Sequence, residues 1–130
     1  EVYLNGDPEH AGFQYRSHDG VAKGPAEDKA KYLFHKEGID PKKDKDLPWV
    51  ALEYGLNGRK YNVQYMSDPA NPNTDTVYSA YRDYGRFGEF FKETIPAGQT
   101  LKLRYRIRVS EGSLPDRESL AKQYTAFTMN

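Results

Sequence analysis

The segment LKLRYRIRV, residues 101–109, alternates apolar and basic residues without a break. The apolar positions share one face of an extended chain, and the basic positions share the other. The apolar set is Leu101, Leu103, Tyr105, Ile107 and Val109, and the basic set is Lys102, Arg104, Arg106 and Arg108. The segment predicts a long β-strand with one core face and one basic, solvated face.

Further strands are predicted along the chain. Residues 10–17 alternate, residues 31–35 form a short strand candidate, and residues 49–56 and 59–66 flank Asn57-Gly58. An Asn-Gly pair between two such runs is typical of a type I′ hairpin turn. Residues 77–82 and 87–92 are also expected to be strands, on either side of Gly85.

One helix is expected at the end of the chain. Ser113 is a plausible N-cap, with acidic residues in the first turn that follows. Leu120, Tyr124 and Phe127 have helical spacing and would dock on the sheet. With seven or eight mostly antiparallel strands, the sequence predicts a mostly β fold: an antiparallel β-sandwich with one C-terminal helix, in a single domain over residues 1–130.

Composition narrows the function classes. The 19 basic and 19 acidic residues cancel, which argues against nucleic-acid binding driven by a basic excess. No apolar run is long enough to span a bilayer, which takes roughly 20 residues. The chain has no cysteine and no phosphate-loop, dinucleotide or nucleophile-elbow motif, so neither a cofactor nor a metal site is predicted.

The stretch TVYSAYRDYGRFGEFF, residues 76–91, combines tyrosines and phenylalanines with two arginines and two acids. Aromatic rings can stack on sugar faces while arginine and aspartate bind hydroxyl groups. The alternative is a bulged strand pair in which Tyr78, Tyr81, Phe87 and Phe91 pack inward and Arg82 pairs with Asp83. The candidate ligand-binding residues are Tyr81, Arg82, Asp83, Tyr84 and Arg86.

Two other groups of residues suggest chemistry. His10 is a weak catalytic candidate as an acid–base residue, with Asp83 or Glu89 as its carboxylate partner. The basic row of residues 102–108 could hold an anion such as a uronic acid, a sulfated glycan or phosphate. The alternative is a solvent face whose arginines pair with acids on a neighbouring strand, for which Glu89 and Glu93 are candidates.

The segments PEHAGFQYR, PWVALEYGLNGRKYNVQYMSDPANP, SAYRDYGRFGEFF and LKLRYRIRVSEG resemble the C-terminal half of a family of secreted or periplasmic bacterial proteins. This family carries a methane-oxygenase-like label and is otherwise described as a domain of unknown function. The resemblance implies a β-sandwich from a longer natural protein, associated with polysaccharide degradation. It assigns no role to His10, Arg82, Asp83 or Arg86, although these residues match the motifs.

Three functional hypotheses follow. The first is a carbohydrate-related domain that binds a glycan or assists polysaccharide breakdown. The second is a structural domain that contacts other chains, or a missing N-terminal half, through its sheet edges. The third is a sugar-active enzyme that uses His10 with a carboxylate. The resemblance places the protein in the periplasm or outside the cell.

Overall fold

A computed structural model describes residues 1–73 and 75–130, mostly as β-strands. The strands are β1 (Val2–Asn5), β2 (Gln14–Arg16), β3 (Lys31–Phe34), β4 (Trp49–Leu56), β5 (Arg59–Ser67), β6 (Val77–Tyr78), β7 (Arg86–Phe90), β8 (Lys92–Ile95) and β9 (Tyr105–Glu111). The helices are α1 (Asp19–Lys23) and α2 (Arg117–Thr128), and 3-10 turns lie at Asp7–Glu9 and Ala26–Asp28.

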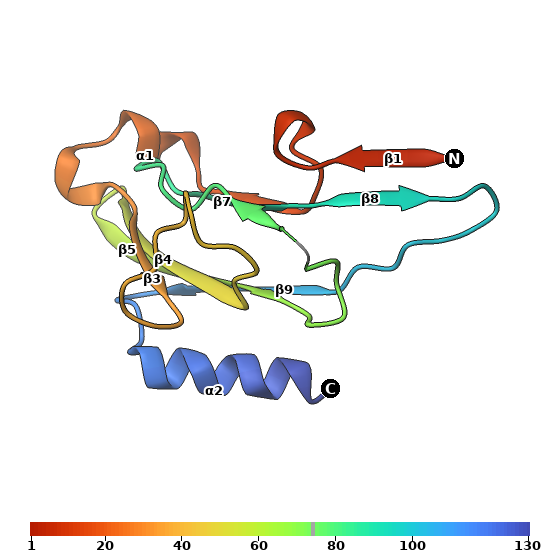
Figure 1. Ribbon diagram of the computed structural model, residues 1–130. Coiled ribbons are helices and arrows are strands. Elements are labelled where there is room, and N and C mark those ends of the chain that lie inside the picture. Colours follow the sequence, from red (N-terminus) through yellow and green to blue (C-terminus); the bar gives the residue numbers. More distant parts are fainter. Residues whose placement is uncertain (74) are drawn as a thin grey trace.

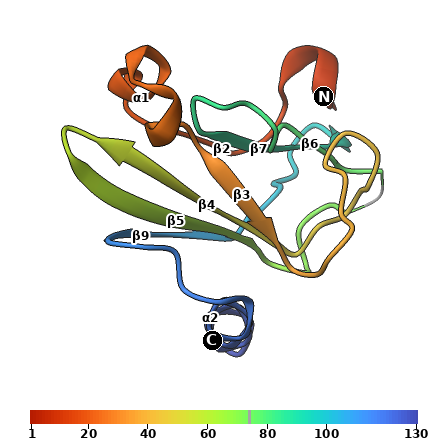
Figure 2. The ribbon, with the colours of Figure 1, turned by 90° about the vertical axis from the view of Figure 1, so that its left-hand side faces the viewer.

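Three layers make up the body of the domain. The central layer is a four-stranded antiparallel sheet in the order β3-β4-β5-β9. A smaller sheet, β2-β7-β6, covers one face, and α2 lies along the other (Figures 1 and 2). Strands β1 and β8 form a separate antiparallel pair that projects from one end (Figure 1). The mostly β, antiparallel, sandwich-like fold with one C-terminal helix is confirmed.

The centre of this sheet is buried on both faces, as the nearly continuous burial along β4 shows. Val50 and Leu52 point toward the smaller sheet, where Val50 packs with Tyr65 and Phe87. Trp49, one residue out of phase with Val50, packs instead under α2. Helix α2 therefore covers part of the sheet face that lies opposite the smaller sheet.

The hairpin at residues 49–67 has the predicted turn. Asn57 and Gly58 both have positive φ angles, 54° and 77°, and β4 pairs with β5 from Trp49↔Met66 to Leu56↔Arg59. A type I′ turn needs positive φ at both central residues, which Asn and Gly tolerate best. The local sequence was sufficient to determine this turn.

The alternating segment of residues 101–109 is only partly a strand. Strand β9 begins at Tyr105, four residues later than predicted, and runs beyond Val109 to Glu111. Tyr105 and Ile107 pack against the core as expected, whereas Leu103 and Val109 are 40% and 55% exposed. The smaller sheet is too narrow to cover the whole apolar face of this segment.

The basic face of this segment also differs from the prediction. Arg104 and Arg106 lie over the ring of Phe127, with the guanidinium carbon 4.3 Å and 5.1 Å from the ring centroid. Arg104 pairs with Asp68 at 2.6 Å, and neither Glu89 nor Glu93 is its partner. Helix α2 therefore covers part of a face that was expected to be solvated.

Helix α2 begins later than predicted but uses the predicted side chains. Asp116, rather than Ser113, is the N-cap, and its carboxylate accepts a hydrogen bond from the Ser119 N–H at 2.8 Å. Leu120 and Phe127 are buried against the sheet, and Tyr124 is half-buried between them. The predicted helical spacing therefore identified the side chains that pack on the sheet. The N-cap is Asp116 and not Ser113.

Candidate functional site

The tip, residues 81–86, is a tight turn whose backbone groups hydrogen-bond with the Tyr32 side chain. The Tyr32 hydroxyl lies 2.6 Å from the Arg82 carbonyl oxygen and 2.9 Å from that of Arg86, and it accepts a hydrogen bond from the Arg86 N–H. Gly85 has φ 81°, and a β-carbon there would lie 2.4 Å from Ser17 Oγ. The distinctive sequence RDYGR, residues 82–86, thus forms the turn between β6 and β7.

The charged side chains of the tip rest on aromatic rings. The Arg82 guanidinium carbon and the Lys42 Nζ lie 5.1 Å and 4.8 Å from the centroid of the Tyr81 ring, and Arg16 lies over Tyr84. Arg86 Nε donates to Gln14 Oε1 at 3.1 Å. These contacts already occupy the ring of Tyr81 and one donor of Arg86.

The tip differs from the predicted strand pair in two ways. Strand β6 ends at Tyr78, and Tyr81 is 41% exposed instead of packing inward. No ion pair joins Arg82 to Asp83 among the described residues. Tyr78, Phe87 and Phe91 are buried as predicted. The buried rings therefore lie on or directly beside β6 and β7, whereas Tyr81 lies on the turn between these strands.

His10 and Glu89 lie on opposite sides of β7. The ring of His10 stacks on Phe90 with 5.1 Å between centroids, whereas the carboxylate of Glu89 contacts Ser67 and Tyr105. Neighbouring residues of a strand point to opposite faces, so Phe90 and Glu89 direct these groups apart. The fold does not bring His10 and Glu89 together as an acid–base pair.

Glu89 is the only Asp, Glu, Lys or Arg residue that is buried within the described part of the chain. It lies on β7, 2% exposed, between the two sheets. Ser67 Oγ and the Tyr105 hydroxyl each donate a hydrogen bond to its Oε1, both at 3.0 Å. Among the described residues, no hydrogen bond ends on Oε2, which leaves this oxygen available to another group.

Burial raises the pKa of the Glu89 carboxyl from 4.5 to about 7, although the hydrogen bonds from Tyr105 and Ser67 act in the opposite direction. The charge of Asp46 contributes a smaller increase. A buried carboxylate loses the solvation that stabilises its charge, and two neutral hydroxyl donors replace only part of it. Glu89 is therefore present in both protonation states near neutral pH.

A cavity of about 130 Å³ opens beside Glu89 between the loops that follow β5 and precede β4. Three carboxylates line it, those of Asp46, Asp68 and Glu89, and the rings of Tyr78 and Tyr124 flank them. Prolines 48, 69 and 72 complete the wall. We call this space the Glu89 cavity.

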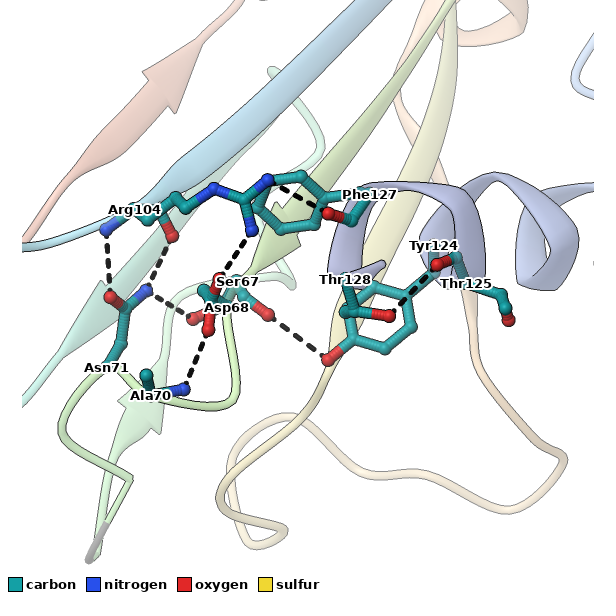
Figure 3. Close-up of polar contacts among 9 residues, drawn as sticks. All are labelled: Ser67, Asp68, Ala70, Asn71, Arg104, Tyr124, Thr125, Phe127 and Thr128. Atoms are coloured by element: carbon teal, nitrogen blue, oxygen red, sulfur yellow. Dashed lines mark hydrogen bonds and ion pairs between the residues drawn. The ribbon is translucent and has the colours of Figure 1, made fainter. Parts of the chain in front are cut away.

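The wall of the Glu89 cavity is fixed by a hydrogen-bond network that joins the end of β5, Arg104 just before β9, and α2 (Figure 3). Asn71 Nδ2 donates to Ser67 Oγ at 3.0 Å, so Asn71, Ser67 and Glu89 form a continuous buried chain. Asn71 also bonds both backbone groups of Arg104, and the Tyr124 hydroxyl donates to the Ser67 carbonyl. Such a network fixes the positions of its polar groups whether or not a ligand is bound.

This arrangement supports two kinds of chemistry. Carboxylates and tyrosine rings around one small cavity can accept hydrogen bonds from sugar hydroxyls and contact a sugar face. A carboxyl group with a pKa near 7 is also suited to proton transfer at neutral pH. Where the structure describes the chain, no cluster of three or more His, Asp or Glu side chains suited to a metal ion is found.

Sequence reasoning identified only part of this site. Glu89 was a candidate, but with His10 or the basic row as its partner. Ser67, Asn71 and Tyr105 were missed as site residues, because they lie on β5, on the loop after it and on β9, which come near β7 only after folding. The one local signal was a glutamate within the run Gly88-Glu89-Phe90-Phe91, whose neighbours are all apolar or small.

No helix described here is both long and apolar enough to cross a membrane. In a comparison with known protein families, residues 1–125 match the family described as "Family of unknown function (DUF6807)". No curated protein and no solved structure matches the chain. Because the match spans nearly the whole sequence, the protein belongs to this family of unknown function.

Proposed function

We propose that the domain binds carbohydrate, either as a glycan-binding module or as an accessory to polysaccharide breakdown, and that the Glu89 cavity holds one sugar residue. The observation that carries the proposal is the grouping of three carboxylates and two tyrosine rings around this cavity. Neutral sugars present many hydroxyl donors and an apolar ring face, and this lining offers acceptors for the first and aromatic surface for the second.

The size of the cavity limits what it can take. Its volume of about 130 Å³ is below the roughly 300–1,000 Å³ of sites that enclose a drug-sized ligand. The Glu89 cavity would therefore admit one end of a glycan, with the remaining residues outside. Asp46, together with Glu89 in its ionised form, also favours a neutral or cationic sugar over an acidic one at this position, because like charges repel. The charge of Asp68 is already compensated by Arg104 at 2.6 Å.

A glycan array followed by calorimetry on the hits tests the proposal. Glu89→Gln and Asp46→Asn remove a carboxylate from the cavity with little change in shape, and asparagine tolerates the left-handed backbone of Asp46, φ 58°. We expect at least a tenfold loss of affinity in each. Asp83→Asn is the matched control, because it removes an exposed carboxylate from the tip and should leave affinity unchanged.

Two results would reject the cavity as the glycan site. If the folded protein binds no glycan, the carbohydrate proposal fails as a whole. If Asp83→Asn, Tyr84→Ala or Arg86→Ala abolishes binding while Asp46→Asn does not, the sugar is held at the tip. Folding of each variant is checked by the near-ultraviolet dichroism of the buried tyrosines.

A second candidate function, assembly with another chain, is favoured by the β1–β8 pair. Val2 and Tyr3 of β1 are 54% and 56% exposed, and β1 pairs only with β8 within the described residues. An exposed apolar edge strand can pair with a strand of another chain. Tyr3→Lys should then convert an oligomer into a monomer in light scattering, whereas a monomeric parent protein would exclude self-assembly through this edge.

We further propose that the domain acts in the periplasm or outside the cell. Polysaccharides are degraded there before their sugars are taken up, so a glycan-binding role fits those compartments. Fractionation of cells that express the full natural protein tests this, and recovery of the protein only with cytoplasmic markers would reject it.

A further inference from the structure

A second cavity lies between the central sheet and helix α2, apart from the Glu89 cavity. It has a volume of about 300 Å³ and is lined by Met66 of β5, by Arg106 and Arg108 of β9, and by Gln123 and Ala126 of α2. Arg106 and Arg108 are two positions apart on one strand, and Gln123 and Ala126 are three apart on one helix. Each pair therefore presents its side chains to the same space.

The two arginines of this cavity lack an anionic partner. Arg104, the preceding residue on the same face, is neutralised by Asp68 at 2.6 Å. Over the part of the chain that the structure describes, no carboxylate lies within 4.0 Å of the Arg106 or Arg108 guanidinium. On α2, Glu118 pairs with Lys122 instead. Two neighbouring cations facing one cavity make it electropositive.

Buried polar atoms beside the arginines also lack partners. Arg108 Nη1 and Gln123 Oε1, both from residues that line the cavity, are buried and make no hydrogen bond within the described structure. The same holds for Gln64 Oε1, whose residue is opposite Arg108 in the β5–β9 register. The Gln64 amide nitrogen, in contrast, donates to the Leu120 carbonyl at 2.9 Å. Buried polar groups are usually paired, so each of these atoms calls for an explanation.

The unpaired atoms specify the chemistry of a ligand. The guanidinium groups of Arg106 and Arg108 offer donors in a planar arrangement that suits a carboxylate. Gln64 Oε1 and Gln123 Oε1 are acceptors and need hydroxyl or amine donors. If Gln123 turned to accept from Arg108, the charge of both arginines would remain uncompensated. One ligand that carries both a carboxylate and a hydroxyl group would pair with the arginines and with Gln123, which line the cavity.

We propose that the cavity between β9 and α2 binds a hydroxylated carboxylate, of which a uronic acid sugar is the chemical type. The carboxylate lies against Arg106 and Arg108, and a hydroxyl donates to the oxygen of Gln123. This site is independent of the Glu89 cavity, because the two share no lining residue. The domain would then hold a neutral sugar in one cavity and an acidic one in the other.

Titration with sodium glucuronate, followed by amide NMR and calorimetry, tests the site. We expect amide shifts centred on residues 106, 108 and 123, and an affinity that falls as salt is raised. Glucose has the hydroxyls without the carboxylate, and acetate has the carboxylate without the hydroxyls. Both should therefore bind this site at least tenfold more weakly, as measured by the amide shifts of residues 106, 108 and 123, which glucose bound in the Glu89 cavity would leave unchanged. Inorganic sulfate should also bind more weakly, because it cannot donate a hydrogen bond to Gln123 Oε1.

Variants separate this site from the rest of the surface. Arg106→Gln, which alters an exposed side chain, should weaken glucuronate binding at least tenfold without affecting the fold, and Gln123→Leu should weaken it severalfold. Arg59→Gln removes an exposed arginine elsewhere on β5 and Glu89→Gln alters the other cavity, so both should bind as the parent does. Absence of glucuronate binding, equal binding of acetate or sulfate, or full binding by Arg106→Gln would overturn the proposal. Glu89→Gln tests the Glu89 cavity and is only a control here. The experiment therefore distinguishes a failure of this proposal from a failure of the proposed glycan site at Glu89.

Discussion

The tip at residues 81–86 and Glu89 lie in the same stretch of sequence, yet they differ in almost every physical respect. The tip is exposed, its charges rest on aromatic rings, and its unusual residues close a turn. Glu89, only three residues beyond Arg86, is buried in a hydrogen-bonded chain with Ser67 and Asn71. The distinctive sequence of the tip thus reflects a tight turn with a positive φ at Gly85. The buried carboxyl group with a raised pKa, Glu89, lies at a position that the sequence hardly distinguishes.

The largest expected effect concerns the protonation of Glu89. Its folded-state pKa of about 7 exceeds the ordinary 4.5, so the folded protein keeps a proton that the unfolded chain releases. The free energy of unfolding should therefore fall by about 3 kcal/mol as pH rises from 4.5 to beyond 7, on top of other groups. Urea unfolding between pH 4 and pH 8 measures this slope.

Glu89→Gln should remove this component of the slope, because glutamine does not titrate but can still accept from Ser67 and Tyr105. Glu9→Gln, at an exposed position, is the matched control and should keep the slope of the parent protein. If parent and Glu89→Gln show the same slope, Glu89 titrates like a solvated carboxyl and the distinction between the two regions is lost.

The next effect tests whether the tip is a structural turn. Gly85→Ala should lower the free energy of unfolding by about 2 kcal/mol or more, because alanine disfavours φ 81° and its β-carbon would meet Ser17 Oγ at 2.4 Å. Gly38 also has a positive φ, 78°, but has open space around it. Gly38→Ala should therefore lower the free energy of unfolding by only about 1 kcal/mol. Equal losses in thermal or urea unfolding would show that the contact with Ser17 is unimportant.

A smaller effect is expected at the hydroxyl that closes the same turn. Tyr32→Phe leaves the Arg86 N–H and the Arg82 carbonyl without this partner and should cost about 1 kcal/mol. Tyr3→Phe removes a hydroxyl from an exposed ring and should cost almost nothing. Hydrogen exchange of the Arg86 amide gives a local readout, and unchanged protection in Tyr32→Phe would contradict the role given to this hydroxyl.

The smallest effect is expected at the most conspicuous charges. Arg82→Ala removes an exposed guanidinium that lies over the Tyr81 ring, and such contacts contribute about 0.5–1 kcal/mol at exposed sites. The free energy of unfolding should change by less than about 1 kcal/mol, measured by urea unfolding. A loss of several kcal/mol would mean that the tip side chains, and not only its backbone, hold the fold.

The sequence alone determined those elements whose cause is local. Asn57-Gly58 sets the hairpin because both residues accept positive φ, and the spacing of Leu120, Tyr124 and Phe127 gives α2 its buried side. Only the tertiary structure decided which faces are covered. The alternating sequence of β9 does not reveal whether its basic side chains contact water or Phe127. In the same way, the sequence around a glutamate in a strand does not reveal whether that glutamate is solvated or buried. Burial depends on segments far apart in the chain, such as Ser67, Glu89 and Tyr105, and these meet only when the sheets close over one another.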